Sequence, residues 1–320
     1  MPFAFVFPGQ GSQSVGMLAK LAASSPVVRE TFDEASTVLG YDLWQVVESG
    51  PEKLSSTEVT QPAMLAAGIA TLRVWQQRGG AQPAVVAGHS LGEFTALVCA
   101  QALDFGPAID LVRFRGKVMQ EAAPAGTGAM AAVLGLSDAD IELACREAAQ
   151  GEVVQPVNFN SPGQIVIAGH ATAVQRAIEA AKAQGAKRAV LLPLSVPAHS
   201  TLMLPAARRL EERLAAVEFR PPRIRYVSAV DAATHQAPED IRGLLVRQVA
   251  SPVRWTDTVT AVAGNDISAV IECGPGKVLT GLGRRILQRE GLTHMALEDP
   301  DSLTAALAAA APGGANHARE

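Results

Sequence analysis

The sequence predicts an α/β fold in which a small ferredoxin-like unit is inserted into a larger domain of strands and helices. Short apolar strands alternate with helices through most of the chain, which is typical of an α/β domain. One of these strands runs into a Gly-x-Ser-x-Gly turn. The middle of the chain instead has the order β-α-β-β-α-β, which predicts the inserted unit.

The chain begins with an apolar strand over residues 3–7 that ends at Pro8-Gly9. Helices are expected over 27–39 and 62–77, with Pro62 in the first turn of the second, where its missing N–H costs little. A strand over 84–87 leads through the serine turn into a helix over 93–101, and a further helix covers 105–121.

Residues 124–196 form the predicted insertion. Strands are expected over 128–136, 153–159, 164–169 and 188–192, and helices over 137–150 and 172–184. Ser137 is expected to cap the first helix, because Asp138 and Asp140 follow in its first turn. The larger domain is therefore predicted to be discontinuous, over 1–123 and 197–305.

The larger domain is expected to resume with helices over 202–217, 238–249 and 276–288 and strands over 225–229 and 269–272. Residues 306–320 are rich in Ala and then in Gly, Pro and Asn, which predicts a flexible tail.

Composition narrows the class of protein. Of the 320 residues, 48% are hydrophobic and 18% are charged, which favours a globular protein with a substantial core. The formal net charge of −4 gives no reason to expect nucleic-acid binding, and no apolar stretch approaches the roughly 18 residues of a membrane span. The three cysteines lack metal-ligand or disulfide spacing, so we expect no metal, no cofactor and a cytoplasmic location.

The motif Gly88-His89-Ser90-Leu91-Gly92 predicts a nucleophilic serine. The first glycine tolerates a sharp turn, and the second lets the following helix approach closely. A serine at this junction presents its hydroxyl beside the N–H groups of a helix N-terminus. The alternative is a glycine-rich turn that only connects two core elements.

A serine nucleophile needs a base within hydrogen-bond reach, because a free hydroxyl is almost never ionised near neutral pH. His89 neighbours Ser90 in the sequence, which turns its ring away from the hydroxyl. His199 lies where the insertion returns the chain to the larger domain, so it is the best candidate for the base. An ordinary surface histidine is the alternative.

Six motifs occur in an order that resembles one family. They are Phe7-Pro8-Gly9-Gln10-Gly11-Ser12-Gln13, Gly88-His89-Ser90-Leu91-Gly92-Glu93, Arg115-Gly116-Lys117-Val118-Met119-Gln120, Asn158-Phe159-Asn160-Ser161-Pro162-Gly163-Gln164, Val196-Pro197-Ala198-His199-Ser200 and Gly274-Pro275-Gly276-Lys277. From residue 3 to about 300 the chain resembles the malonyl-CoA:acyl carrier protein transacylases. The resemblance implies a hydrolase-like parallel-sheet core that carries an inserted ferredoxin-like subdomain.

The resemblance also implies the catalytic roles. Ser90 matches the nucleophile and His199 the base of that family. Gln10 and Leu91 match the residues whose backbone N–H groups form the oxyanion hole. The reaction that this implies is a two-step, ping-pong transfer of a malonyl group through a malonyl-serine intermediate.

The remaining matches concern the substrate and the base. Arg115 matches the arginine that binds the malonyl carboxylate, and a guanidinium presents the planar fork that a carboxylate requires. Without the resemblance, Arg115 reads as an ordinary helix-surface arginine. Gln248 matches a residue whose backbone carbonyl orients the histidine, and Gln61 and Asn160 match residues that line the pocket.

The partners implied are malonyl-CoA or coenzyme A and a phosphopantetheinylated acyl carrier protein, with the chain acting as a monomer. Neither nucleic acid nor membrane is expected as a partner. Basic side chains that are candidates for contact with coenzyme A phosphates or the carrier protein are Lys187, Arg188, Lys277, Arg284 and Arg285.

Other readings of the same motifs remain open. A serine hydrolase or thioesterase would use the same serine turn, and a catalytically silent docking subunit would use neither Ser90 nor His199. Among transferases, the rival to a supplier of fatty acid synthesis is a discrete acyltransferase of a polyketide or malonate-decarboxylase system.

Overall fold

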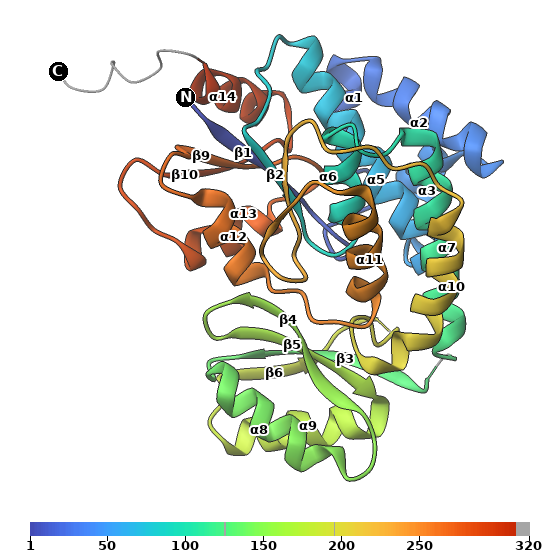
Figure 1. Ribbon diagram of the computed structural model, residues 1–320, viewed down its shortest axis with the longest axis vertical. Coiled ribbons are helices and arrows are strands. Elements are labelled where there is room, and N and C mark those ends of the chain that lie inside the picture. The colour runs from blue at the N-terminus through green and yellow to red at the C-terminus, as the bar shows by residue number, and fades with distance from the viewer. Residues whose placement is uncertain (125, 195, 312–320) are drawn as a thin grey trace.

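The computed structural model describes residues 1–124, 126–194 and 196–311, and its strands form two sheets (Figure 1). The larger sheet contains, in spatial order, β10 (Thr293–Ala296), β9 (Ala269–Glu272), β1 (Phe3–Phe7), β2 (Val85–Gly88), β7 (Arg225–Val227) and β8 (Thr234–His235). The smaller sheet contains β4 (Val154–Ser161), β5 (Gln164–His170), β3 (Gly128–Leu134) and β6 (Arg188–Leu191). The chain therefore has a mixed α/β fold with a parallel-sheet core.

The parallel strands of the larger sheet end at one edge. Strand β1 pairs in parallel with both β2 and β9, with Phe7 opposite Gly88 and Val6 opposite Glu272. Strand β8 pairs antiparallel with β7 at the outer edge. Loops that follow the carboxyl ends of neighbouring parallel strands meet at one edge, which is where sites form in α/β sheets.

Helices cover both faces of the larger sheet. The side chains of strand β1 alternate between the two faces, and each set packs against a different group of helices. Phe3, Phe5 and Phe7 belong to one core cluster, which also contains side chains of α5 (Thr57–Gln77), α6 (Gly92–Cys99) and α7 (Phe105–Ala122). Ala4 and Val6 point to the other face and pack with α12 (Trp255–Ala263) and α13 (Val278–Ile286). A strand buried on both faces is expected to be apolar throughout, as β1 is.

The other helices surround this core. They are α1 (Ala19–Ser24), α2 (Val27–Leu39), α3 (Leu43–Ser49), α4 (Pro51–Leu54), α10 (Leu204–Ala215), α11 (Pro238–Val249) and α14 (Pro300–Ala310). None of the helices in the described ranges is long and apolar enough to cross a membrane.

The smaller sheet is antiparallel and has its own core. Helices α8 (Asp138–Ala149) and α9 (Ala171–Ala183) lie together against one face of it, at the bottom of Figure 1. The Ser137 side chain accepts from the Asp140 N–H and caps α8, as predicted. The outer edge of β4 is tied to the larger part of the molecule, because the Phe159 N–H donates to the Val253 carbonyl at 3.0 Å.

The predicted position of Pro62 in its helix and the predicted start of the tail are both wrong. Helix α5 begins at Thr57, so Pro62 lies inside it and not in its first turn. Most of α5 is buried, and this packing offsets the lost hydrogen bond. Helix α14 extends to Ala310, into the tail predicted over 306–320, because Ala306 and Ala310 face the core. The rest of that predicted tail, from 312 onward, lies outside the described residues.

Candidate active site

Ser90 lies in the sharp turn between β2 and α6, with a φ angle of 52°. The turn is closed by two glycines at points of backbone contact. A Cβ atom on Gly88 would lie 1.9 Å from the Gly92 carbonyl carbon, and one on Gly92 would lie 2.0 Å from the Phe7 carbonyl oxygen. Only glycine fits at either position, and this close approach of helix to strand fixes where the Ser90 hydroxyl points.

His199 faces this hydroxyl from the loop before α10. Its Nε2 lies 2.7 Å from Ser90 Oγ, and its Nδ1 lies 2.7 Å from the backbone oxygen of Gln248. A carbonyl can only accept, so Nδ1 carries the proton and Nε2 is free to accept from the serine.

The end of α11 holds His199 in this position. Its imidazole donates to the Gln248 carbonyl, and its backbone N–H donates to the Val249 carbonyl at 3.1 Å. Both carbonyls belong to the last turn of α11. The last carbonyl groups of a helix have no N–H partner within the helix, so they are free to accept from His199. Burial and the nearby Arg115 lower the pKa of His199 to about 3, so the imidazole is neutral near pH 7.

Arg115 is a buried cation beside the serine. Its side chain is 1% exposed; Nη1 donates to Gln61 Oε1 at 2.9 Å, and Nη2 donates to Gln248 Oε1 at 2.9 Å and to Ser90 Oγ at 3.2 Å. Within the described residues its Nε has no acceptor. Burial lowers the pKa of Arg115 to about 10, which still leaves it charged near pH 7. A buried guanidinium with a donor to spare is a site for a carboxylate.

Gln10 and Leu91 bring two backbone N–H groups to the same edge of the sheet. Leu91 immediately precedes α6, and Gln10 lies in the loop after β1. Gly9 allows that loop to lie against the serine turn, since a Cβ atom there would be 2.4 Å from the His89 carbonyl oxygen. Among the described residues, neither N–H donates to a protein acceptor. Both are free to donate to a ligand.

His89 and Asn160 connect the two sheets. His89 Nε2 lies 2.9 Å from Asn160 Oδ1, which is on β4 of the smaller sheet. The His89 ring also packs edge-on against Trp255, with the ring centroids 5.3 Å apart. His89 therefore points away from Ser90 Oγ, and the carboxamide oxygen of Asn160 is occupied by a protein donor.

The predicted basic contacts lie outside this hydrogen-bond network. Lys187 and Arg188 are exposed at the start of β6, one of the two outer strands of the smaller sheet. Lys277 is exposed at the start of α13 and pairs with Glu298, and Arg285 donates to Gln164 Oε1. Arg284 donates to the His294 carbonyl. No hydrogen bond in the described part of the chain joins these side chains to Ser90, His199 or Arg115.

Two polar residues of the network have no role in the sequence-based prediction. Glu93 is fully buried in α6, where it accepts from Gln248 Nε2 at 2.8 Å and from the Tyr226 hydroxyl. Glu93 is the one charged residue in a helix whose other residues are apolar or, at Thr95, uncharged, and this is the signal in the sequence that marks it. Nothing in the sequence pairs it with Tyr226, which lies 133 positions away.

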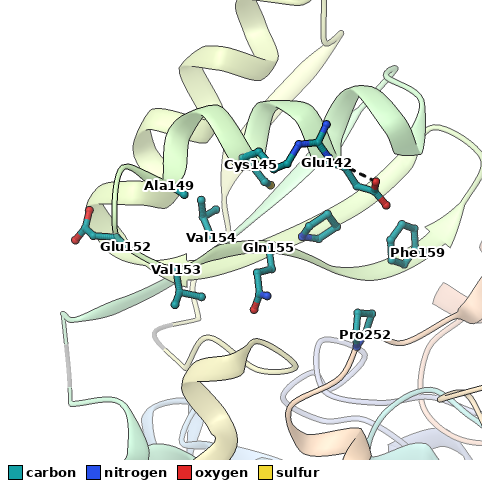
Figure 2. Close-up of a pocket in the computed structure, with 11 residues that line it drawn as sticks. Glu142, Cys145, Ala149, Glu152, Val153, Val154, Gln155, Phe159 and Pro252 are labelled. Atoms are coloured by element: carbon teal, nitrogen blue, oxygen red, sulfur yellow. Dashed lines mark ion pairs between the residues drawn. The ribbon is translucent and has the colours of Figure 1, made fainter.

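An open hollow lies elsewhere, between α8 and β4 of the smaller sheet. Its volume is about 520 Å³, and Figure 2 shows Cys145 on its helix side and Pro252 on the opposite side. Its lining residues include none of the hydrogen-bonded set around Ser90. Burial raises the pKa of the Cys145 thiol to about 12, which disfavours the reactive thiolate form near pH 7.

Comparison with known proteins gives one consistent result. The acyl transferase domain family matches residues 4–300. A malonyl CoA-acyl carrier protein transacylase of Escherichia coli (strain K12) is 58% identical over 306 residues, which cover 95% of this chain and 98% of the relative. The protein of the same name from Bacillus subtilis (strain 168) is 42% identical, with 95% and 96% covered.

Solved structures agree with the sequence relatives. An acyl carrier protein S-malonyltransferase from Vibrio cholerae is 56% identical and superposes with a TM-score of 0.91 over 96% of this chain and 100% of its own. A malonyl-transacylase solved in complex with a type II polyketide synthase acyl-carrier protein is 55% identical, with a TM-score of 0.94 over 96% and 99% of the two chains.

Proposed function

The chain belongs to the acyl transferase family, and we propose that within it the chain transfers malonyl groups from malonyl-CoA to the phosphopantetheine thiol of an acyl carrier protein. The observation that carries the proposal is the position of the buried Arg115 guanidinium, whose Nη2 lies 3.2 Å from Ser90 Oγ. The same Ser90 hydroxyl is hydrogen-bonded to His199 Nε2. Such a site suits an acyl group with its own carboxylate.

In the first half-reaction, Ser90 Oγ attacks the thioester carbonyl as His199 Nε2 takes its proton. The N–H groups of Gln10 and Leu91 donate to the oxyanion of the tetrahedral intermediate, and each such donor is typically worth about 3 kcal/mol. The intermediate collapses with loss of the coenzyme A thiolate, which takes the proton from the His199 imidazolium. Ser90 then carries a malonyl ester.

In the second half-reaction the carrier thiol gives its proton to His199 and attacks the malonyl ester. The same oxyanion donors stabilise the second intermediate, and Ser90 Oγ leaves with the proton. The Gln248 carbonyl keeps the proton on Nδ1 throughout, so that Nε2 faces the reacting atoms in both steps.

Arg115 connects substrate choice to the chemistry. Its charge lowers the pKa of His199, and a bound malonyl carboxylate offsets that charge. The carboxylate thereby makes His199 a stronger base, in addition to binding the guanidinium. Acetyl groups supply neither effect.

Arg115→Ala is expected to lower kcat/KM for malonyl-CoA by about 10²–10³-fold, the usual cost of removing one partner of a buried charged pair. The kcat/KM for acetyl-CoA should fall much less, because acetyl has no carboxylate to lose. Competition between the two donors in one reaction measures the ratio directly. Arg113→Ala on the same helix is the control, since Arg113 is partly exposed and pairs with Asp110. An unchanged malonyl-to-acetyl ratio in Arg115→Ala would contradict the role given to Arg115.

The pH profile gives a second prediction. Because the pKa of His199 in the free enzyme is about 3, kcat/KM for Ser90 acylation by malonyl-CoA is expected to stay level from about pH 8 to about pH 5. A histidine with the ordinary pKa of about 6.5 would lose most of its activity over that range. Stopped-flow acylation in a constant-ionic-strength buffer series measures the profile. A midpoint near 6.5 would contradict the description of a buried, neutral base.

The lowered pKa of His199 also determines how the free energy of unfolding depends on pH. Between the unfolded pKa of about 6.5 and the folded value of about 3, the unfolded chain binds the His199 proton and the folded chain does not. The contribution of His199 to the free energy of unfolding is therefore present above pH 6.5 and is lost as the pH falls.

The main rival is a hydrolase or thioesterase, and transfer to the carrier separates the two. The enzyme is mixed with malonyl-CoA and a phosphopantetheinylated carrier protein, and malonyl-carrier and free malonate are both measured. Most of the malonyl should reach the carrier. Release as free malonate, with the carrier left unloaded, would favour the hydrolase, and no reaction at all would favour a docking subunit.

We also propose a two-part architecture for the chain. Residues 124–196 form a ferredoxin-like subdomain inserted into a hydrolase-like domain; the element order β3-α8-β4-β5-α9-β6 and the strand order β4-β5-β3-β6 support it. The chain acts as a monomer in the cytoplasm and supplies fatty acid synthesis. A carrier of a polyketide system is the alternative acceptor, supported by the relative solved with one.

A further inference from the structure

We propose that Glu93 and Tyr226 are positioning residues that act through the Gln248 side chain on both His199 and Arg115. The inference rests on the proposed function, because its effect is on malonyl transfer. It begins from the burial of Glu93 and Tyr226, each of which is 0% exposed. A carboxylate is rarely buried without a specific partner, and neither residue touches the reacting atoms.

The Gln248 carboxamide joins the parts of the site. Its Nε2 donates to the Ser90 backbone oxygen at 2.9 Å and to Glu93 Oε1 at 2.8 Å, and its Oε1 accepts from Arg115 Nη2 at 2.9 Å. Ser90 O only accepts and Arg115 only donates, so the amide has one orientation that satisfies all three partners. Both N–H bonds of Nε2 are then used, and Glu93 takes one of them.

Glu93 is itself held from the neighbouring strand. The Tyr226 hydroxyl on β7 donates to its second carboxylate oxygen, and the Ser228 hydroxyl lies against the same group. Strand β7 pairs with β2, the strand that enters the serine turn. The sheet thus fixes Glu93, Glu93 fixes the Gln248 amide, and the amide fixes one edge of the Arg115 guanidinium.

Gln248 contacts His199 through its backbone carbonyl. Its backbone oxygen accepts from His199 Nδ1, so we expect a shift of Gln248 that carries its backbone along to displace the histidine as well as the arginine. One residue therefore couples proton transfer to carboxylate binding. Without Glu93, an N–H of the Gln248 amide loses its acceptor in a buried site, which favours a different amide position.

Charge is a separate effect that substitution can isolate. Glu93 raises the pKa of Arg115 through its negative charge, while burial raises the pKa of the Glu93 carboxyl itself. Glu93→Gln removes the charge but keeps an oxygen for Gln248 Nε2 and a polar group for the Tyr226 hydroxyl. Glu93→Ala removes both the charge and the contacts.

The experiment compares Glu93→Ala, Glu93→Gln and Tyr226→Phe for transfer from malonyl-CoA and from acetyl-CoA. Rates are divided by the fraction of Ser90 that each enzyme acylates. We expect Glu93→Ala to lower kcat/KM for malonyl-CoA by about 10–100-fold and the malonyl-to-acetyl ratio by about tenfold. Glu93→Gln should restore both to within about threefold of wild type. Tyr226→Phe leaves the contact between Glu93 and Gln248 in place, so its kcat/KM and its malonyl-to-acetyl ratio should lie between those of Glu93→Ala and Glu93→Gln.

Glu272→Ala is the matched control for stability. Glu272 is equally buried, and it accepts from the Leu279 and Thr280 N–H groups at 3.1 and 2.7 Å, away from the Ser90 network. Its loss should lower the melting temperature without changing the malonyl-to-acetyl ratio. A merely structural Glu93 would behave in the same way.

Two results would overturn the inference. One is an unchanged malonyl-to-acetyl ratio in Glu93→Ala, and the other is a Glu93→Gln enzyme as impaired as Glu93→Ala, which would make the charge decisive. Wild-type enzyme is assayed in parallel. If wild type itself does not carry malonyl to the carrier, the proposed function has failed and not this inference.

Discussion

Replacement of Ser90 by alanine is expected to lower the rate constant for malonyl transfer by about 10⁴–10⁶-fold, because the step that forms the acyl-enzyme has no other nucleophile. The oxyanion donors and Arg115 stay in place, so malonyl-CoA should still bind. Steady-state transfer and binding of malonyl-CoA by calorimetry separate the two quantities. Loss of transfer with binding retained is the expected pattern.

The matched control is Ser25→Ala. Ser25 is a buried serine whose hydroxyl donates to Gln77 at 2.8 Å, and neither residue belongs to the hydrogen-bonded set around Ser90. The Ser25→Ala enzyme should keep full transfer activity. A Ser90→Ala enzyme that transfers malonyl within about tenfold of wild type would mean that malonyl passes directly from one thiol to the other without a covalent intermediate.

Replacement of His199 by alanine is expected to lower both half-reactions by roughly 10³–10⁵-fold, since both pass protons through Nε2. The residual rate should rise with pH, because hydroxide then replaces the imidazole as base, whereas wild type is level over the same range. Rapid-quench measurement of acylation and of transfer to the carrier gives each half-reaction separately. Equal losses in the two halves are the expected signature.

His294→Ala is the control for this variant. His294 is also a buried histidine, and its Nε2 lies 3.1 Å from the Leu287 carbonyl oxygen, but it is far from the serine turn in the fold. A His199→Ala enzyme that slows only one half-reaction would contradict a single shared base.

The elements that the sequence predicts well are those whose ends are marked by particular residues. Helix α11 matches the prediction over 238–249, because Pro238 is a good first residue and two acidic residues follow it. Helix α12 has one acidic residue, Asp257, in its first turn but no first-turn proline and no side-chain cap, and its Thr and Val residues disfavour a helix in isolation. Packing of Trp255 and Val259 against the larger sheet decides its conformation, which the sequence does not reveal.

The same contrast applies to the site. Ser90 sits in a local motif, so five consecutive residues predict its strained turn. The Arg115–Gln248 and Glu93–Tyr226 contacts each join residues 133 positions apart, and only the folded sheet brings them together. Resemblance supplies Arg115 and Gln248, but the Gln248 side-chain contacts with Glu93 come from the structure alone.

Intact-protein mass spectrometry tests the central claim most directly. Wild type and Ser90→Ala are mixed with malonyl-, methylmalonyl- and acetyl-CoA together, before and after addition of a phosphopantetheinylated carrier protein. We expect a malonyl adduct on wild type alone, which disappears from the enzyme and appears on the carrier. An adduct that persists in Ser90→Ala, or one that is released as free acid while the carrier stays unloaded, would contradict a malonyl transferase that works through Ser90.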